Sequence, residues 1–143
     1  MDVWNIKKMD DAHYVIRIDK DEEVLQKLTA LCEIEDIKCA SVVGLGAAKK
    51  VQIGLFDTRD KKYNSIEIEE PMEITSLLGN VSRKDGEVYL HFHINVCDKS
   101  MSVKGGHLNY CIIGATCELV LTKLDGEVNR KFDEKIGLNL FQF

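Results

Sequence analysis

Residues 88–96 read Val-Tyr-Leu-His-Phe-His-Ile-Asn-Val and alternate between two kinds of side chain. Because successive side chains of an extended strand point to opposite faces, Phe92 and Ile94 share one face while His91 and His93 share the other. The apolar face is the one expected to enter a hydrophobic core. The pattern therefore predicts a strand that is buried on one side and carries two imidazoles on the other.

A third histidine follows a pair of glycines, at Gly105-Gly106-His107. Glycine permits both a tight turn and a close approach of neighbouring backbones, so the pair can bring His107 beside the first two histidines. Neutral imidazoles are ligands of zinc and related divalent ions, and three of them leave a fourth coordination position open. We therefore predict a divalent metal ion, with zinc as the expected ion, on His91, His93 and His107.

The spacing of the histidines also fits a simpler interpretation. His91 and His93 can be ordinary surface residues of a strand, and His107 can be a loop histidine bonded to the backbone. Spacing alone gives the two interpretations similar weight. Three of the four histidines lie in this short part of the sequence, which favours the metal site. The fourth, His13, stands apart and is expected to be an ordinary strand residue.

The composition of the 143-residue chain is typical of a globular protein, with 45% apolar and 30% charged residues. The length and the lack of a linker predict one domain over residues 1–143. Five cysteines without a Cys-x-x-Cys pair predict reduced, mostly buried thiols rather than disulfides or a thiolate zinc cluster. The N-terminal residues contain no apolar run suited to a signal peptide or a membrane span. We therefore expect a cytoplasmic protein without a membrane partner.

One helix and a series of strands are predicted. Short acids after residue 18 can cap a helix that begins near Asp21 and ends near Asp36, with one apolar stripe. Apolar and β-branched runs then predict strands at residues 39–44, 51–56, 63–69, 72–81, 87–96, 112–121 and 128–132. The expected fold class is α+β (α/β), with a mixed, mainly antiparallel sheet of about seven strands and one principal helix packed on it.

Glycine and proline mark the expected turns. Lys84-Asp85-Gly86 and Leu124-Asp125-Gly126-Glu127 are each predicted to join two strands as a hairpin. The single proline, Pro71, is expected at the head of a strand, where its missing N–H does least harm. Gly44-Leu45-Gly46 predicts a tight turn or a bulge, because a dinucleotide-binding turn needs a third glycine where this chain has Lys49.

Other polar and apolar residues could take part in the function. Asp98, Asn95 and Asn109 are near the histidines in sequence and could orient metal ligands or move a proton, although such residues are more often ordinary loop or strand-end residues. The tail at residues 136–143 is apolar to its end. Because a continuous apolar patch is unfavourable in water, the tail should pack on a sheet or on a neighbouring subunit.

Two groups of residues resemble the plants-and-prokaryotes-conserved (PPC) domain family. The stronger one comprises Leu90-His91-Phe92-His93-Ile94, Asp98 and Gly105-Gly106-His107-Leu108. The supporting one comprises residues 43–46 and 72–80, and the similarity covers essentially the whole chain. The resemblance implies a curved mixed sheet with few helices, assembly as a homotrimer, and metal ligation by His91, His93 and His107.

The family resemblance also bears on DNA binding. Plant members carry this domain behind AT-hook segments in nuclear DNA-binding proteins, and stand-alone prokaryotic members are described in similar terms. This chain contains no Arg-Gly-Arg-Pro segment, and Pro71 is its only proline. A minor-groove hook is therefore absent from the sequence, and DNA contact does not follow from that motif.

Three hypotheses from different classes follow. The first is a homotrimeric, metal-binding module with a binding or regulatory role, associated with DNA or with a DNA-binding protein. The alternative is a metal-dependent enzyme that activates water at an open three-histidine zinc site, with Asp98 or a carboxylate of a neighbouring subunit as base. The third is direct DNA binding through Lys49, Lys50, Arg59, Lys61 and Lys62, which the net charge of −5 disfavours.

Overall fold

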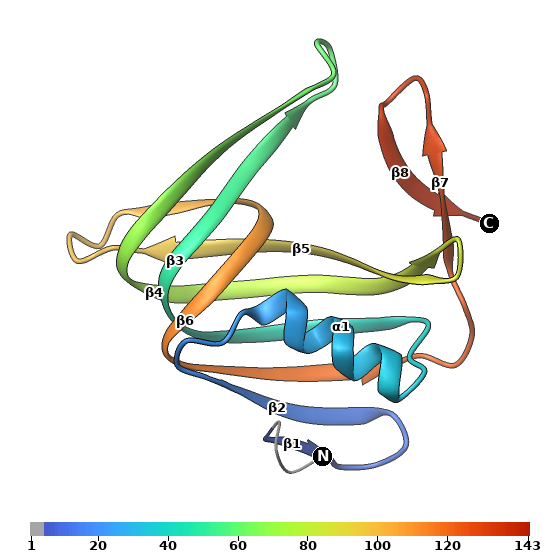
Figure 1. Ribbon diagram of the computed structural model, residues 1–143, viewed down its shortest axis with the longest axis horizontal. Helices are drawn as coiled ribbons and strands as arrows, with labels where there is room; N and C mark the ends of the chain where they lie inside the picture. Colours follow the sequence, from blue (N-terminus) through green and yellow to red (C-terminus); the bar gives the residue numbers. More distant parts are fainter. Residues whose placement is uncertain (1–4) are drawn as a thin grey trace.

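A computed structural model describes residues 5–143 of the chain. The described residues form these elements: β1 (Ile6–Lys8), β2 (His13–Asp19), α1 (Val24–Ile34), β3 (Ala40–Asp57), β4 (Lys62–Lys84), β5 (Glu87–Cys97), β6 (Val103–Lys123), β7 (Asn129–Asp133) and β8 (Leu138–Gln142) (Figure 1). A cytoplasmic location was predicted partly from residues 1–4, and these residues lie outside the described part of the chain. The helix of the described part is neither long nor apolar enough to cross a membrane.

The strands form one sheet in the order β1-β2-β6-β3-β4-β7-β8, and β5 lies between β4 and β6. Within the described residues, the pairing of β4 with β7 is parallel and the other strand pairs are antiparallel. The long strands β3, β4 and β6 bend away from the helix, and β3 and β4 continue into a projecting hairpin (Figure 1). The predicted fold class, a mixed and mainly antiparallel sheet with one helix, is confirmed.

Two pairs of predicted strands are single strands in the structure. The runs at residues 39–44 and 51–56 belong to β3, and those at 63–69 and 72–81 belong to β4. The pairing of β3 with β4 has a bulge at Gly44–Gly46, as predicted for these glycines, and another between Ala48 and Lys50. Pro71 falls opposite the second bulge, where β4 skips from Glu69 to Met72 in the pairing. The prediction that Pro71 begins a strand is wrong, because the bulge removes the need for its N–H.

Of the two roles considered for Gly105-Gly106, a tight turn and a close approach of backbones, the structure shows the second. Both glycines lie inside β6, opposite Asn95 and Ile94 of β5. The chain reverses earlier, at residues 98–102, where Met101 has a φ of 66°. A Cβ atom at Gly105 would lie 1.9 Å from the side-chain oxygen of Asn95. These glycines therefore allow β5 and β6 to pack closely and do not reverse the chain.

The two predicted hairpins have different outcomes. Asp85 and Gly86 join β4 to β5 with φ values of 51° and 81°, the positive pair that a two-residue hairpin requires. The segment 124–127 instead carries the chain from β6 to β7, which pairs with β4 and β8. A second hairpin with β6 is impossible there, because β2 and β3 already occupy both edges of β6.

The helix α1 is capped by Glu23, slightly later than the predicted start near Asp21. The Glu23 carboxylate accepts hydrogen bonds from the backbone amides of Leu25 and Gln26 at 3.0 and 2.8 Å. Asp21 itself has a φ of 74°, which excludes it from the helix. One face of α1 buries Val24, Leu28, Leu31 and Cys32 against the sheet.

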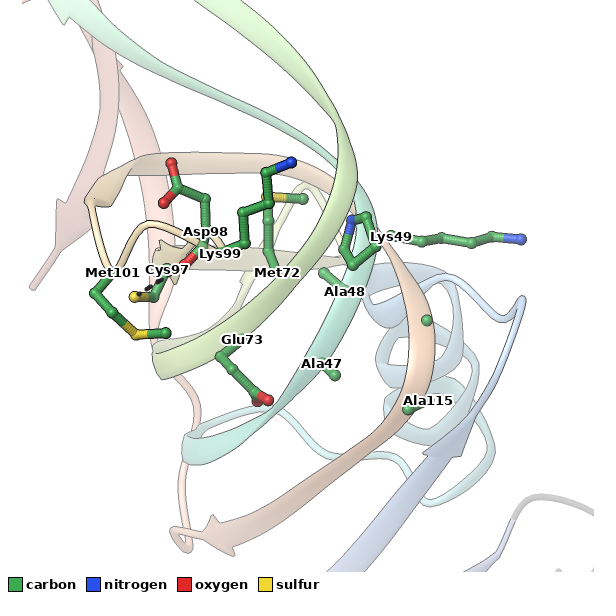
Figure 2. A pocket seen from close by; sticks show the side chains of 12 residues that line it. Ala47, Ala48, Lys49, Met72, Glu73, Cys97, Asp98, Lys99, Met101 and Ala115 are labelled. Carbon is green, nitrogen blue, oxygen red and sulfur yellow. Dashed lines mark hydrogen bonds between the residues drawn. The ribbon is translucent and has the colours of Figure 1, made fainter.

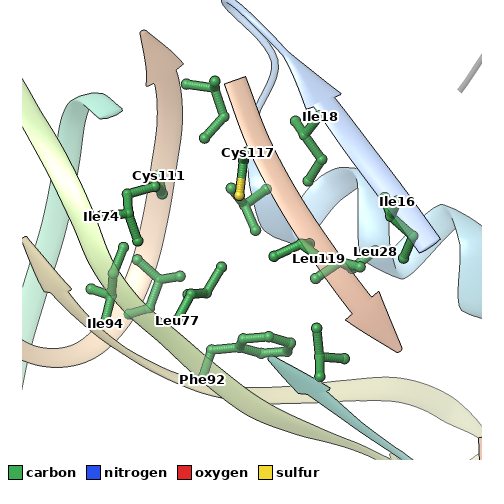
Figure 3. Packing of buried hydrophobic residues seen from close by; sticks show 14 of the residues in the cluster. Ile16, Ile18, Leu28, Ile74, Leu77, Phe92, Ile94, Cys111, Cys117 and Leu119 are labelled. Atoms are coloured by element: carbon green, nitrogen blue, oxygen red, sulfur yellow. The ribbon is translucent and has the colours of Figure 1, made fainter. Parts of the chain in front are cut away.

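The hydrophobic core lies between the strands and the buried face of α1 (Figure 3). Phe92, Ile94 and Leu77 enter it from the strands, together with the buried thiols of Cys111 and Cys117. All five cysteines are free thiols, as predicted, and three of them are buried. No helix of the described residues covers the opposite face of the sheet, which carries His93 and on which Val43 and Leu78 are exposed.

Candidate metal centre

The alternation of β5 is the feature that positions two of the histidines. Phe92 and Ile94 are 1% and 2% exposed, whereas His93 is exposed and His91 half-buried. The faces of this strand are therefore assigned as predicted. His107 lies on β6 directly opposite His93, so the third ring arrives through strand pairing.

The three imidazoles converge on one point. One nitrogen from each of His91, His93 and His107 lies within 4.8 Å of the other two. The ring centroids are 5.1, 5.4 and 5.8 Å apart. A zinc ion about 2.0–2.1 Å from each nitrogen in tetrahedral geometry would hold the nitrogens about 3.4 Å apart. Modest ring rotations therefore suffice to close this donor set around a divalent ion.

Glycines allow the strands to come close enough for this arrangement. Gly54 of β3 is the other neighbour of His107, and a Cβ atom at Gly106 would lie 2.7 Å from the Gly54 carbonyl oxygen. A Cβ atom at Gly54 would itself lie 2.4 Å from the Tyr63 ring. Tyr63 thus reaches across Gly54 and makes an edge contact with the His107 ring, at 5.9 Å between centroids.

The surroundings favour the neutral form of two of the rings. Burial lowers the pKa of His91, and the nearby His93, Arg130 and His107 lower it further. Burial also lowers the pKa of His107, with a smaller effect from His93. A metal ion binds the deprotonated ring nitrogen, so these shifts keep the ligand atoms available at neutral pH.

The cluster lines a cavity of about 540 Å³. The walls come from the β3–β4 hairpin, from β5 and β6, and from the C-terminal hairpin of β7 and β8; they comprise Gly54, Leu55, Phe56, Tyr63, Tyr89, His91, His93, His107, Asn109, Arg130, Leu138, Asn139 and Leu140. None of these described lining residues is an aspartate or glutamate. The apolar tail thus packs as the strand β8 beside β7 and supplies one wall, while Phe143 stays fully exposed.

The three polar residues considered as helpers have separate locations. Asn109 lines the cavity and accepts a hydrogen bond from the Tyr63 hydroxyl. Asn95 donates to the Ser76 hydroxyl at 3.1 Å and does not line the cavity. Asp98 lies beside Cys97 in another hollow, of about 400 Å³, at the β5–β6 turn (Figure 2). The structure therefore does not bring Asp98 to the histidines.

Arg130 of β7 is a cavity residue that sequence reasoning missed. Its guanidinium donates to the Ser82 hydroxyl at 2.8 Å, to the Asn139 carbonyl at 2.9 Å and to the Asn80 side-chain oxygen at 2.9 Å. It also stacks over the rings of Tyr89 and Phe141, at 4.7 and 4.3 Å from their centroids. No local motif marks Arg130, because a long-range strand pairing brings it to the site.

The basic residues considered for phosphate binding are partly engaged elsewhere. Lys49 forms an ion pair with Asp21, and Lys50 forms one with Glu67 at 3.4 Å. Lys61 donates to the carbonyl of Thr58 at 2.7 Å. The charges of Lys49 and Lys50 are therefore partly balanced by neighbouring carboxylates.

A bent, mainly antiparallel sheet with one helix and a three-histidine cluster on the uncovered face defines a small α+β protein with a candidate metal centre. The Plants and Prokaryotes Conserved (PCC) domain family, also written PPC, matches residues 7–125. The chain belongs to this family. The C-terminal hairpin that carries Arg130 lies beyond the matched residues.

Solved structures of similar proteins agree with this assignment. A protein of Bacteroides thetaiotaomicron named "putative dna binding protein" is 31% identical, with a TM-score of 0.94 over 98% of this chain and 97% of that one. A metal-containing protein of Archaeoglobus fulgidus is 32% identical, with a TM-score of 0.87 over 98% and 96% of the two chains. A PPC protein of Pyrococcus horikoshii is 33% identical, with a TM-score of 0.86 over 98% and 94%. The comparison with curated proteins found no match.

Proposed function

We propose that this PPC protein is a metal-binding module in which His91, His93 and His107 hold a divalent ion, with zinc as the expected ion. The observation that carries the proposal is the convergence of three ring nitrogens within 4.8 Å of one another on the uncovered face of the sheet. The similarity to a protein described as metal-containing supports it. Three nitrogen ligands leave one coordination position for an exchangeable ligand.

The cavity chemistry favours binding over catalysis. A zinc ion activates water when a neighbouring group can take up or relay the proton. The described residues that line the cavity include no carboxylate, and Asp98 lies in a different hollow. The alternative function, a metal-dependent enzyme, would therefore lack a carboxylate base from the cavity lining of its own chain.

Metal content decides the first proposal. Protein purified without a histidine tag and exposed to zinc should hold one equivalent per chain, and His91→Ala should lower the content to background. His13→Ala is the matched control, because His13 is bonded to Asp10 outside the cluster. Elemental analysis after gel filtration gives the readout. Equal zinc in His91→Ala and wild type would overturn the assignment.

Self-association is the second part of the proposal, with a homotrimer as the expected form. Four exposed or partly exposed apolar residues lie in one row across the strands, since Val15 pairs with Val120, Val120 with Val43, and Val43 with Leu78. Leu78 in turn pairs with His93. A continuous apolar row on an uncovered face is typical of a protein–protein interface. The same face would thus carry both the contact between subunits and the metal ligands.

Association with DNA is a second candidate, favoured by the name of the Bacteroides relative. The net charge of −5 and the ion pairs of Lys49 and Lys50 oppose direct binding. If the chain contacts phosphates, its affinity for duplex DNA should fall steeply with salt concentration, because bound counterions are released. A gel-shift titration of random duplex at several salt concentrations tests this. No retardation at low salt would leave only an indirect association through a DNA-binding partner.

A further inference from the structure

We propose that the cavity beside the three histidines binds a small organic carboxylate, whose charged end lies between the metal ion and Arg130 and whose apolar part contacts the leucine-lined wall. This inference rests on the proposed metal site and names the ligand class of that site. Its further support comes from the charge, burial and neighbours of Arg130.

Arg130 is a buried cation without a counter-ion. Its side chain belongs to a residue that is 9% exposed, and its hydrogen-bond partners Ser82, Asn80 and Asn139 are all neutral. Within the described residues, it forms no ion pair with a carboxylate. A guanidinium that has lost water without gaining a negative partner is unfavourable, and burial accordingly lowers the pKa of Arg130. An anion entering the cavity would remove this imbalance.

The position of Arg130 places its charge beside the metal ligands. It donates to Asn80, the residue of β4 directly opposite His91 in β5. It also stacks on Tyr89, which precedes His91 by two residues and shares its face of the strand. Arg130 and the three histidines line the same cavity.

The net charge of the occupied site would be strongly positive. A divalent ion on neutral imidazoles and one guanidinium together bring three positive charges, and no described lining residue is acidic. Guanidinium carries five N–H donors, and three hydrogen bonds from Arg130 are present. In the proposed complex, the remaining donors bind one carboxylate oxygen while the other oxygen takes the open metal position.

The rest of the cavity wall is apolar and limits the ligand. Leu55, Phe56, Leu138 and Leu140 contribute hydrocarbon surface from two hairpins that face each other across the site. A cavity of about 540 Å³ admits a small molecule rather than a polymer. A carboxylate attached to a compact apolar or aromatic group would match both the positive charge of the site and its apolar wall.

Benzoate and its neutral analogue benzamide provide the test. Zinc content is measured first on tag-free protein, and each compound is then titrated into the zinc-loaded protein by calorimetry. We expect benzoate to bind at least about tenfold more tightly than benzamide. Arg130→Gln should retain the zinc content and lower benzoate affinity about tenfold to a hundredfold, with little change for benzamide.

A second variant avoids the hydrogen bonds that Arg130 makes to the fold. Leu140→Asp introduces a negative charge into the cavity wall at a position that is 37% exposed, and Leu140→Asn is its neutral control. Only the aspartate variant should lose benzoate binding. Equal affinity for benzoate and benzamide in zinc-loaded wild type, or equal effects of the two Leu140 variants, would overturn the inference and leave the metal site standing. Wild-type protein that holds no zinc would instead overturn the proposed function.

Discussion

At the scale of single residues, Phe92 and His93 are neighbours with opposite roles. The Phe92 ring is 1% exposed and lies over Gly79, where an added Cβ atom would be 2.3 Å from the ring. Phe92→Ala should therefore lower the free energy of unfolding by ~3–5 kcal/mol, because it leaves a cavity in the core. His93→Ala removes an exposed side chain and should change this free energy by less than ~0.5 kcal/mol in metal-free protein.

Urea unfolding in the presence of a chelator measures both variants under the same conditions. The chelator removes any metal contribution, so the comparison reports packing alone. Similar losses in the two variants would mean that the faces of β5 are assigned the wrong way round.

The residues of the site differ in how far the sequence could predict them. Strict alternation was enough to place His91 and His93 on one face, since the period of a strand is fixed by its geometry. The approach of His107 also followed from sequence, although the glycines before it allow close strand contact instead of a turn. Arg130 could not be predicted, because its place depends on one parallel pairing between Asn129 and Arg83.

At the scale of elements, the β5–β6 turn depends on one carboxylate. Asp98 accepts hydrogen bonds from the Ser100 hydroxyl and from the amides of Ser100 and Ser102, at 2.6, 2.9 and 3.1 Å. The bond from the Ser100 hydroxyl, then the bond from the Ser102 amide, lower the pKa of Asp98. A lowered pKa means that the folded state favours the charged form. This stabilisation is present above the ordinary aspartate pKa of about 3.9 and is lost as the pH falls through the lower, folded value.

Asp98→Asn should therefore destabilise the protein at pH 7 and lose that effect at strongly acidic pH. The measurement is the difference in urea midpoint between wild type and variant, repeated from pH 7 down to pH 3. Asp85→Asn is a useful control, because it removes a carboxylate from the other hairpin turn. A difference that stays constant over the range would contradict the role of the Asp98 charge.

Element boundaries were the less predictable part of the fold. Pro71 read as a strand start because a central strand cannot use its nitrogen as a donor, yet a bulge between Ala48 and Lys50 lets β4 continue past it. The sequence at 124–127 resembles the turn at Asp85-Gly86. A hairpin with β6 cannot form there, because β2 and β3, which are distant in sequence, already pair with both edges of β6. Local signals determine a turn, whereas the available sheet edge determines which strand follows.

At the scale of the whole molecule, the apolar row on the uncovered face predicts a specific assembly defect. Val43 is 50% exposed and lies between Val120 and Leu78. If this row is the subunit contact, wild type should have about three times the 16.2 kDa chain mass, and Val43→Lys should behave as a monomer, because burying an unpaired charge costs several kcal/mol.

Light scattering coupled to gel filtration gives the masses directly. Leu124→Lys is the matched control, since Leu124 is 52% exposed and lies in the loop after β6, outside the row. The control should keep the wild-type mass. A monomeric wild type would remove self-association from the proposed function, and a Val43→Lys variant of unchanged mass would move the contact to another surface.

The C-terminal hairpin has few backbone hydrogen bonds to the rest of the sheet, and this should affect how readily it opens. β7 has one backbone pair with β4, and the other bonds of the hairpin to the sheet include side-chain bonds of Arg130 and Lys61. In contrast, β3 and β6 are paired along most of their length. Strands held by few backbone bonds open at a lower free energy than central ones, so amide hydrogens of β7 and β8 should exchange with deuterium well before those of β3 and β6. Because β8 supplies one wall of the cavity, early exchange there would mean that this wall opens while the core stays closed.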